Sequence, residues 1–282
     1  MPKPPRFFIT LDAVRGPQII MTGDDLRHIR TVLRKQPGDL LILLDGKGKE
    51  YTARIVRMER TEIIAEVVSE ITREAAHPII TLCQGLPKAD KMDWIVQKAT
   101  ELGVANIVPL ITERTIVKIK DEEKRVSRWQ KIAREAAMQS KRADIPIIEE
   151  IRKYADFLQA FSNPPMPPFA KGGNNAASPP LEKGGRGGFS SSGALLLLPW
   201  EEGTNPIKGV LTQKQDVKHI VVLIGPEGGF SEAEAGAARG KGFHLVSLGP
   251  NILRTETAAV AVLSMIGYEY FAQADGPSDA QK

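Results

Sequence analysis

The sequence predicts an α/β protein with two parts: a small β-rich region at the N-terminus and a larger region in which strands and helices alternate. Between residues 6 and 71, short apolar runs are separated by turns, a spacing typical of a small β-barrel or sandwich. From residue 79 onward, strand, helix and strand follow one another in the βαβ pattern of a parallel sheet. The strand-like runs there are continuously apolar, which indicates a sheet covered on both faces.

The first region holds five expected strands and one helix. The strands are expected at residues 7–9, 18–21, 39–44, 50–56 and 62–68. The helix begins near Asp24 or Asp25, and its apolar residues at helical spacing are Leu26, Ile29, Val32 and Leu33. The other face carries the basic residues Arg27, His28, Arg30, Arg34 and Lys35. Such a face can follow a phosphate backbone, although an ordinary solvated helix shows the same charges.

The second region alternates strands with helices. Strands are expected at 79–82, 106–110, 195–199, 220–224 and near 244, with helices at 89–102 and at about 123–140. The stretch from Arg114 to Arg142, which includes the second helix, is the most basic part of the chain. This charge is compatible with RNA contact and equally with a solvated helix face.

Residues 162–193 interrupt the alternation. Proline, glycine and serine dominate this stretch, and too few apolar groups remain to offset the entropy of ordering it. Two near-copies within it, beginning at Pro167 and Pro179, indicate an insertion that arose by duplication. We expect this insertion and the tail at 274–282 to be disordered.

Composition limits the classes of function. The 282 residues carry 38 Lys and Arg against 34 Asp and Glu, so the charge permits nucleic-acid contact without requiring it. Cys83 is the single cysteine and the four histidines are scattered, so no internal disulfide is possible and no metal site is expected. The densest apolar run, residues 194–198, is too short to cross a bilayer. We expect a cytoplasmic protein that binds neither membrane nor metal.

Two glycine-proline turns stand at the ends of two expected strands, and each leads into a helix. The first runs from Gly225 to Ser231, and the second follows Leu248 and ends near Thr257. Glycine lets a ligand approach the main chain and proline fixes φ, so paired turns of this kind can frame a small-molecule pocket. Ser231 and Glu234 have capping-box spacing, and the helix after Thr257 lacks a polar stripe, which predicts a buried helix.

No common catalytic or nucleotide signature accompanies these turns. The chain lacks a Gly-x-Gly-x-x-Gly fingerprint, a Gly-Lys-Ser/Thr phosphate loop and a Gly-x-Ser-x-Gly elbow. The polar residues near the turns are Glu227, Ser231, Asn251, Arg254, Thr255, Glu256 and Thr257. Arg254 follows Ile252 and Leu253, which places its guanidinium beside an apolar slot and favours a planar, partly charged ligand.

The same turns resemble a known family. The runs Ile224–Ser231 and Leu248–Ala258 are similar to the signatures of the RsmE family, the 16S ribosomal RNA uridine N3-methyltransferases of the SPOUT superfamily. Further similar motifs are Arg6-Phe7-Phe8, His28, Val32-Leu33-Arg34, Gly38-Asp39, Leu86-Pro87-Lys88, Met92-Asp93-Trp94, Gln97–Gly103, Arg128-Trp129, Glu135-Ala136-Ala137 and Gln139-Ser140. Two features depart from the pattern: the 162–193 insertion, and Lys141, which stands where a glycine is usual.

The resemblance implies a fold, a cofactor and partners. It implies a PUA-like RNA-binding β-barrel at 1–74, followed by a SPOUT methyltransferase domain at 77–273. The C-terminal part of that domain would thread a trefoil knot, bind S-adenosylmethionine and form a homodimer. The implied substrate is a uridine of 16S rRNA, either free or in the small ribosomal subunit.

The resemblance also implies roles for individual residues. Cofactor contacts are expected from Leu198, Pro199, Ile224, Gly225, Pro226, Glu227, Gly228, Gly229, Leu248, Gly249, Ile252, Leu253 and Thr257. RNA contacts are expected from Arg6, His28, Arg30, Arg34, Arg114 and Arg142.

Catalytic roles are expected for Arg254 and Glu256. Uridine N3 must lose its imide proton during methylation, and Arg254 is the natural counter-charge for a uracil anion because arginine stays protonated. Glu256 is the best carboxylate for a base or a hydrogen-bond acceptor, or alternatively it caps the following helix. Glu227 could serve the cofactor's amino group or its own helix end.

Two other classes of function remain open on the sequence. A non-catalytic RNA-binding or ribosome-assembly protein could keep the barrel and lose the chemistry, although the intact turns and Arg254 argue against it. A nucleotide-dependent α/β enzyme is disfavoured by the missing phosphate fingerprint.

Overall fold

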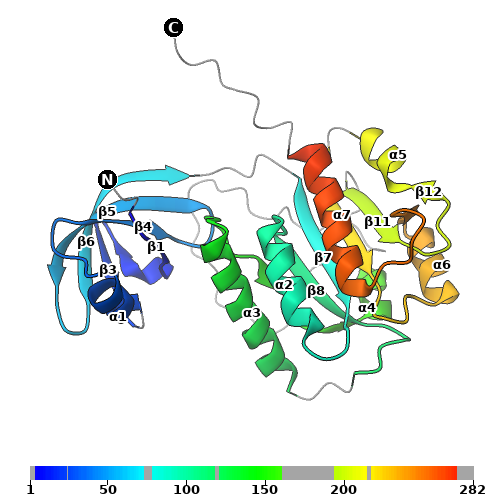
Figure 1. Cartoon of the computed structure of the whole chain (residues 1–282), viewed down its shortest axis with the longest axis horizontal. Helices are drawn as coiled ribbons and strands as arrows, with labels where there is room; N and C mark the ends of the chain where they lie inside the picture. Colours follow the sequence, from blue (N-terminus) through cyan, green and yellow to red (C-terminus); the bar gives the residue numbers. More distant parts are fainter. Residues whose placement is uncertain are drawn as a thin grey trace, which may run out of the picture. The chain divides into compact units, whose positions relative to one another are not determined.

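A computed structural model of the chain describes residues 4–23, 25–72, 78–117, 121–160, 194–214 and 217–271 (Figure 1). Asp24, the expected disordered insertion and the expected disordered tail at 274–282 lie outside these residues. The chain divides into two compact units, one of Met1–Ala76 with Gln130–Ile147 and the other of His77–Trp129 with Ile148–Lys282. Within the described ranges, no helix is both long enough and apolar enough to span a membrane.

The first unit is built on a six-stranded sheet in the order β1-β4-β5-β6-β3-β2. Its strands are β1 (Arg6–Phe8), β2 (Val14–Arg15), β3 (Gln18–Met21), β4 (Leu40–Leu44), β5 (Lys49–Met58) and β6 (Ile63–Thr72). β1 runs parallel to β4, and the other neighbours are antiparallel. The five strands expected here are therefore confirmed, with the short β2 as an addition.

The helix expected after β3 forms, but in a wider shape than a regular α-helix. It consists of α1 (Asp25–Arg27) followed by a π-helical turn, His28–Val32. Leu26 and Ile29 are buried in the core, whereas Val32 is 64% exposed. The prediction that Val32 and Leu33 join the buried face is wrong, because the widened turn breaks the 3.6-residue period on which it rested.

The second unit is built on a parallel sheet in the order β10-β8-β7-β13-β11-β14-β12, with β9 paired to β8. Its strands are β7 (Ile79–Gly85), β8 (Asn106–Ile111), β9 (Ile147–Ile148), β10 (Arg152–Lys153), β11 (Ala194–Pro199), β12 (Asn205–Pro206), β13 (His219–Ile224) and β14 (His244–Ser247). The central strands β7, β11 and β13 are buried along nearly their whole length. The predicted parallel, doubly covered sheet is confirmed.

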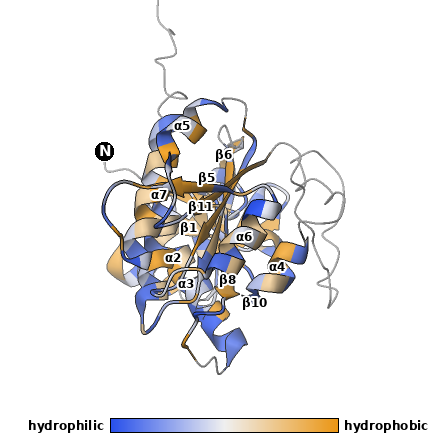
Figure 2. Cartoon of the chain, turned by 90° about the vertical axis from the view of Figure 1, so that its right-hand side faces the viewer, coloured by the Kyte–Doolittle hydropathy of each residue, from blue (hydrophilic) through white to orange (hydrophobic). Residues whose placement is uncertain are grey.

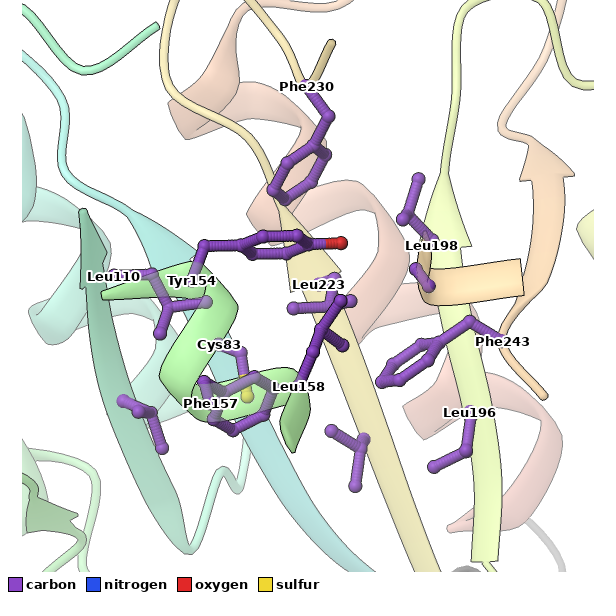
Figure 3. Packing of buried hydrophobic residues seen from close by; sticks show 13 residues of the cluster. Cys83, Leu110, Tyr154, Phe157, Leu158, Leu196, Leu198, Leu223, Phe230 and Phe243 are labelled. Carbon is purple, nitrogen blue, oxygen red and sulfur yellow. The ribbon is translucent and has the colours of Figure 1, made fainter. Parts of the chain in front are cut away.

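Helices cover both faces of this sheet. They are α2 (Lys91–Glu101), α4 (Tyr154–Ala160), α5 (Ile207–Thr212), α6 (Glu232–Gly240) and α7 (Thr255–Tyr270), whereas α3 (Glu122–Gln139) crosses the division between the two units. Figure 2 shows α2 and α7 on one side of the sheet and α4 and α6 on the other. On the α4 side, Tyr154 and Phe157 pack with Phe230, Phe243 and the strand side chains (Figure 3).

The last two helices begin close to the two glycine-proline turns. Ser231 caps α6 in the predicted capping box, with its hydroxyl accepting from Glu234 N and the Glu234 carboxylate accepting from Ser231 N. Helix α7 buries only one face within the chain, and Tyr268 on the other face is 80% exposed. The prediction of a helix buried all round is therefore wrong for the single chain, because the described elements cover α7 from one side.

The capping box predicts a measurable loss of stability. Replacing Ser231 with Ala should lower the free energy of unfolding by about 1 kcal/mol, since Glu234 N in the first turn of α6 loses its side-chain acceptor. Urea denaturation followed by circular dichroism measures this loss. Ser264→Ala, at an exposed position inside α7, is the matched control and should leave the urea midpoint unchanged. Equal midpoints for the two variants would contradict the assigned cap.

Candidate functional site

A cavity lies where β11, β13 and β14 end at the same edge of the parallel sheet. Parallel strands present ligand sites at their carboxyl ends, because the loops that follow them gather there. The cavity encloses about 210 Å³, several times the roughly 30 Å³ that one water molecule occupies in the liquid. Its wall consists of Pro199, Trp200, Glu201, Ile224, Gly225, Pro226, Glu227, Gly228, Gly229, Phe230, Ser247, Leu248, Gly249, Pro250, Asn251, Ile252, Leu253, Thr255 and Ala258.

The first turn, at the end of β13, is tight enough to require glycine. Gly229 N donates to Pro226 O at 2.9 Å, and Gly229 has a φ of +67°. A Cβ added to Gly225 would lie 2.9 Å from the Gly229 carbonyl carbon, so no side chain fits there without opening the turn. Arg114 Nη1 donates to Gly228 O at 2.7 Å and holds the tip of the turn from outside.

The second turn lies between β14 and α7. Gly249 has a φ of +138°, which is in the region that favours glycine. Its N–H donates to Ser247 Oγ at 3.3 Å, and this hydroxyl donates to Gly249 O at 3.1 Å. Across the cavity, Trp200 N donates to Val246 O at 3.0 Å, which fixes the loop that follows β11. The two predicted turns therefore face one cavity, because they follow β13 and β14, which flank β11 and end at the same edge of the sheet.

A buried polar junction joins the turn after β13 to two other elements. Gln84, fully buried near the end of β7, donates from Nε2 to Gly85 O and Thr255 Oγ1, both at 2.9 Å. Thr255 Oγ1 in turn donates to Gly225 O at 2.5 Å. Three segments far apart in sequence are thus tied together beside the cavity, and no sequence motif indicated this role of Gln84.

The two carboxylates near the turns share one lysine. Lys91 Nζ, at the start of α2, lies 3.0 Å from Glu227 Oε1 and 3.4 Å from Glu256 Oε2. The hydrogen bond with Glu227 is the main cause that raises the pKa of Lys91 above its usual value. Burial alone would raise the pKa of Glu227, but hydrogen bonds from Lys91 and from backbone N–H groups outweigh it and lower the pKa.

These contacts change the two roles considered for Glu227. Lys88 N donates to both of its oxygens, at 3.0 and 3.2 Å, in addition to the Lys91 contact. Glu227 therefore anchors its turn to the start of α2, and its contact with the cofactor's amino group stays a prediction. Glu256 lies in the first turn of α7, where a carboxylate is favoured by the helix dipole, and it also pairs with Lys91.

Arg254 occupies the N-cap position of α7. Its carbonyl accepts from Ala258 N at 2.8 Å, while its side chain is exposed and has no hydrogen-bond or ion-pair partner among the described residues. It immediately follows Leu253, which lines the cavity, so the guanidinium is free to reach a ligand at the rim.

Eleven of the thirteen predicted cofactor residues line the cavity, and two do not. Leu198 is fully buried in the hydrophobic core, and Thr257 is exposed on α7. The wall residues that the sequence analysis did not assign include Trp200, Glu201 and Phe230. Trp200 and Glu201 directly follow the strand that ends at Pro199, so the rule about carboxyl ends would have found them.

Four of the six predicted RNA-binding residues already have internal partners. Arg6 pairs with Glu50 at 3.0 Å, and Arg142 pairs with Asp144. Arg30 donates to the carbonyls of Glu59 and Arg60, so it closes the hairpin between β5 and β6. In the second unit, Arg114 holds the Gly228 turn.

The other two lie on the exposed side of the first unit's helix. His28 is exposed, with its ring 6.0 Å from that of Phe7 between centroids. Arg34 is exposed and stands just after the π-helical turn with a φ of +50°. RNA contact by any of the six stays a prediction.

Comparisons with known proteins agree with this layout. The sequence matches the family "RNA methyltransferase domain" over residues 74–267 and the family "RNA methyltransferase PUA domain" over residues 21–68. A curated relative, "Ribosomal RNA small subunit methyltransferase E" of Bacillus subtilis, is 30% identical over 94% of this chain and 96% of its own length.

Solved structures give the same picture. A ribosomal RNA small subunit methyltransferase E from Neisseria gonorrhoeae, bound to S-adenosyl methionine, is 32% identical with a TM-score of 0.74, covering 94% of this chain and 98% of that one. A putative methyltransferase from Legionella pneumophila in complex with the bound cofactor is 30% identical with a TM-score of 0.71 and the same two coverages.

The close approach of β7 to the first turn predicts a second stability effect. A Cβ on Gly85 would lie 2.6 Å from Pro226 Cδ and 2.7 Å from Pro226 N, so Gly85→Ala should lower the free energy of unfolding by about 1–3 kcal/mol. Gly236→Ala is the matched control, because Gly236 lies inside α6 with nothing within 4 Å of an added Cβ. That control should be neutral or stabilising by about 0.5–1 kcal/mol. Urea midpoints for both variants test the contrast, and a stable Gly85→Ala protein would refute it.

Proposed function

The chain belongs to the RNA methyltransferase family that includes the ribosomal RNA small subunit methyltransferase E proteins, and from this premise we propose that it methylates N3 of a uridine in 16S rRNA. The observation that carries the proposal is the cavity between two glycine turns at the carboxyl edge of the sheet. Relatives of the same fold, at 30% and 32% identity, have been solved with S-adenosylmethionine. The proposed cofactor is accordingly S-adenosylmethionine.

The residues present suit this cofactor. Gly225, Gly228 and Gly249 line the cavity and carry no side chain of their own, so a ligand can come close to their main chain. Ile224, Ile252 and Leu253 provide apolar contact for a planar base. When bound, S-adenosylmethionine supplies a methyl group on a positively charged sulfur.

Arg254 is proposed to act on the uracil. Methylation at N3 removes the imide proton, so negative charge develops on the base and a fixed cation nearby lowers the barrier. The exposed, unpaired Arg254 side chain at the cavity rim can donate two parallel hydrogen bonds to this charge or to the nucleotide's phosphate. Glu256, two residues further along in the first turn of α7, is the proposed acceptor of the imide proton or of a hydrogen bond from the imide N–H.

The remaining assignments extend the same proposal. We place a PUA-like barrel at 1–74, the catalytic domain at 77–273 and a trefoil knot in the C-terminal part, which is consistent with Gln84 and Thr255 meeting Gly225. The incompletely buried side of α7, with Val260 and Met265 half-buried and Tyr268 80% exposed, supports a homodimer. The proposed setting is the cytoplasm, with the small ribosomal subunit or its rRNA as partner.

Direct methylation tests the proposed function. Purified protein, S-adenosylmethionine and small subunits lacking the modification should yield 3-methyluridine in 16S rRNA, detected by nuclease digestion and mass spectrometry. Calorimetric titration should show S-adenosylmethionine binding. A protein that binds RNA but no S-adenosylmethionine would favour the non-catalytic alternative, and stabilisation by ATP or NAD would favour a nucleotide-dependent enzyme.

Arg254 provides a sharper test. Both Arg254→Ala and Arg254→Lys should lower kcat by about 100-fold, because the planar pair of donors is lost in each. S-adenosylmethionine affinity should change by only a few fold. Arg239→Ala, at an exposed position on α6, is the control and should keep full activity. If Arg254→Lys instead abolished cofactor binding while the bound fraction reacted normally, Arg254 would belong to the cofactor site and Glu256 would become the leading uridine residue.

RNA binding by the first unit is tested with Arg27→Glu and Arg34→Glu, which are both exposed and leave the hairpin contact of Arg30 intact. Each lost phosphate contact should reduce the slope of log affinity against log salt by about one. S-adenosylmethionine affinity should stay constant, and Lys208→Glu on α5 should leave the slope unchanged. An unaltered slope in the Arg27 and Arg34 variants would remove this helix from the RNA interface.

A further inference from the structure

Lys91 lies at the point where three functional segments meet. It is the first residue of α2, and its ammonium group contacts Glu227 on the cavity wall and Glu256 in the first turn of α7. The side chains are partly buried, with 33% of Lys91, 29% of Glu227 and 18% of Glu256 exposed. One cation therefore stands between two carboxylates beside the proposed reaction site.

The two carboxylates depend on Lys91 to different degrees. Glu227 also accepts two hydrogen bonds from Lys88 N, so it keeps a partner if Lys91 is lost. Glu256 Oε2 is buried without a hydrogen bond in the described structure, and Lys91 is the ion-pair partner that faces it. A buried carboxylate oxygen left without its cation is strongly unfavourable and would turn toward other donors.

We propose that Lys91 is a positioning residue for methyl transfer, acting through Glu256. The ion pair holds Glu256 Oε2 against α2, which leaves the other carboxylate oxygen for the uridine. It also offsets one of two negative charges next to the place where the uracil becomes an anion. This role rests on the proposed function, because it concerns the uridine step.

Loss of Lys91 should lower kcat for the uridine step but should not weaken cofactor binding. Without Lys91, the site gains net negative charge, which opposes a developing uracil anion but does not repel a sulfonium cation. Lys91→Met should therefore lower kcat about tenfold, the size of a typical coupling between contacting residues. S-adenosylmethionine affinity, measured by calorimetry, should stay within threefold of the wild type or become tighter.

The experiment compares matched variants of the full chain. Lys91→Arg keeps the positive charge and should retain most of the wild-type kcat. Lys91→Gln keeps a hydrogen-bond donor without charge and should show the same loss of kcat as Lys91→Met. It replaces Lys91→Met in the comparison if that variant folds poorly. Lys98→Met is the control, because Lys98 belongs to the same helix and pairs only locally with Glu101 at 2.8 Å. Urea midpoints of all variants separate loss of fold from loss of position.

A double-mutant cycle decides whether Lys91 acts through Glu256. In a Glu256→Gln background, Lys91→Met should reduce kcat by less than twofold, because the group that it positions has already gone. Additive losses, or a Lys91→Met variant with the kcat of Lys98→Met, would overturn the inference alone. A wild-type protein that binds S-adenosylmethionine yet transfers no methyl group to 16S rRNA would overturn the proposed function and this role with it.

Discussion

The cavity depends on a main-chain approach that only small residues permit. The end of β7, the turn after β13 and the start of α7 meet so closely that a Cβ on Gly85 or Gly225 would collide with neighbouring backbone. Gln84 and Thr255 satisfy the polar groups that this approach buries, with the Gly225 carbonyl accepting from both. Glycines of both turns stand in this wall, so backbone geometry helps to set its shape.

The acidic side chains around the site already have a cationic partner. Glu227 and Glu256 both pair with Lys91, and both oxygens of Glu227 also accept from Lys88 N. Arg254, in contrast, has an exposed side chain with no hydrogen-bond or ion-pair partner in the described part of the chain, and it lies in sequence between Leu253 and Thr255 of the cavity wall. A ligand that arrives there with negative charge thus meets a cation whose hydrogen bonds are not already taken, a preorganised arrangement that needs little rearrangement on binding.

The strands and most of the cavity wall could be predicted from the sequence, and the reasons are local. Apolar runs mark the buried strands, and Gly-Pro turns directly after two of them mark the site, since parallel strands end at one edge. The role of Gln84 in the buried junction could not be predicted, because its partners lie 141 and 171 residues away in sequence. Lys91 was missed for the same reason, since nothing near it in sequence reveals the two carboxylates.

Periodicity failed where its assumption of regular geometry failed. Val32 and Leu33 fall at helical spacing, yet the π-helical turn rotates them toward solvent. Helix α7 shows a different failure, because apolar residues on all sides predict that a helix is covered but do not identify what covers it. The first failure lies in the local backbone geometry, and the second lies in tertiary information that the sequence pattern lacks.

The direction of β11 separates the point where the chain can be lengthened from the point where it contacts a ligand. The strand begins at Ala194, where the chain enters the sheet from the 162–193 segment, and it ends at Pro199 on the cavity wall. The five residue-to-residue steps along this strand put roughly 17 Å between these points. Sequence can therefore lengthen at the amino edge without touching the ligand-binding edge, which makes this connection an entry point for evolutionary drift and for inserted tags or fused domains.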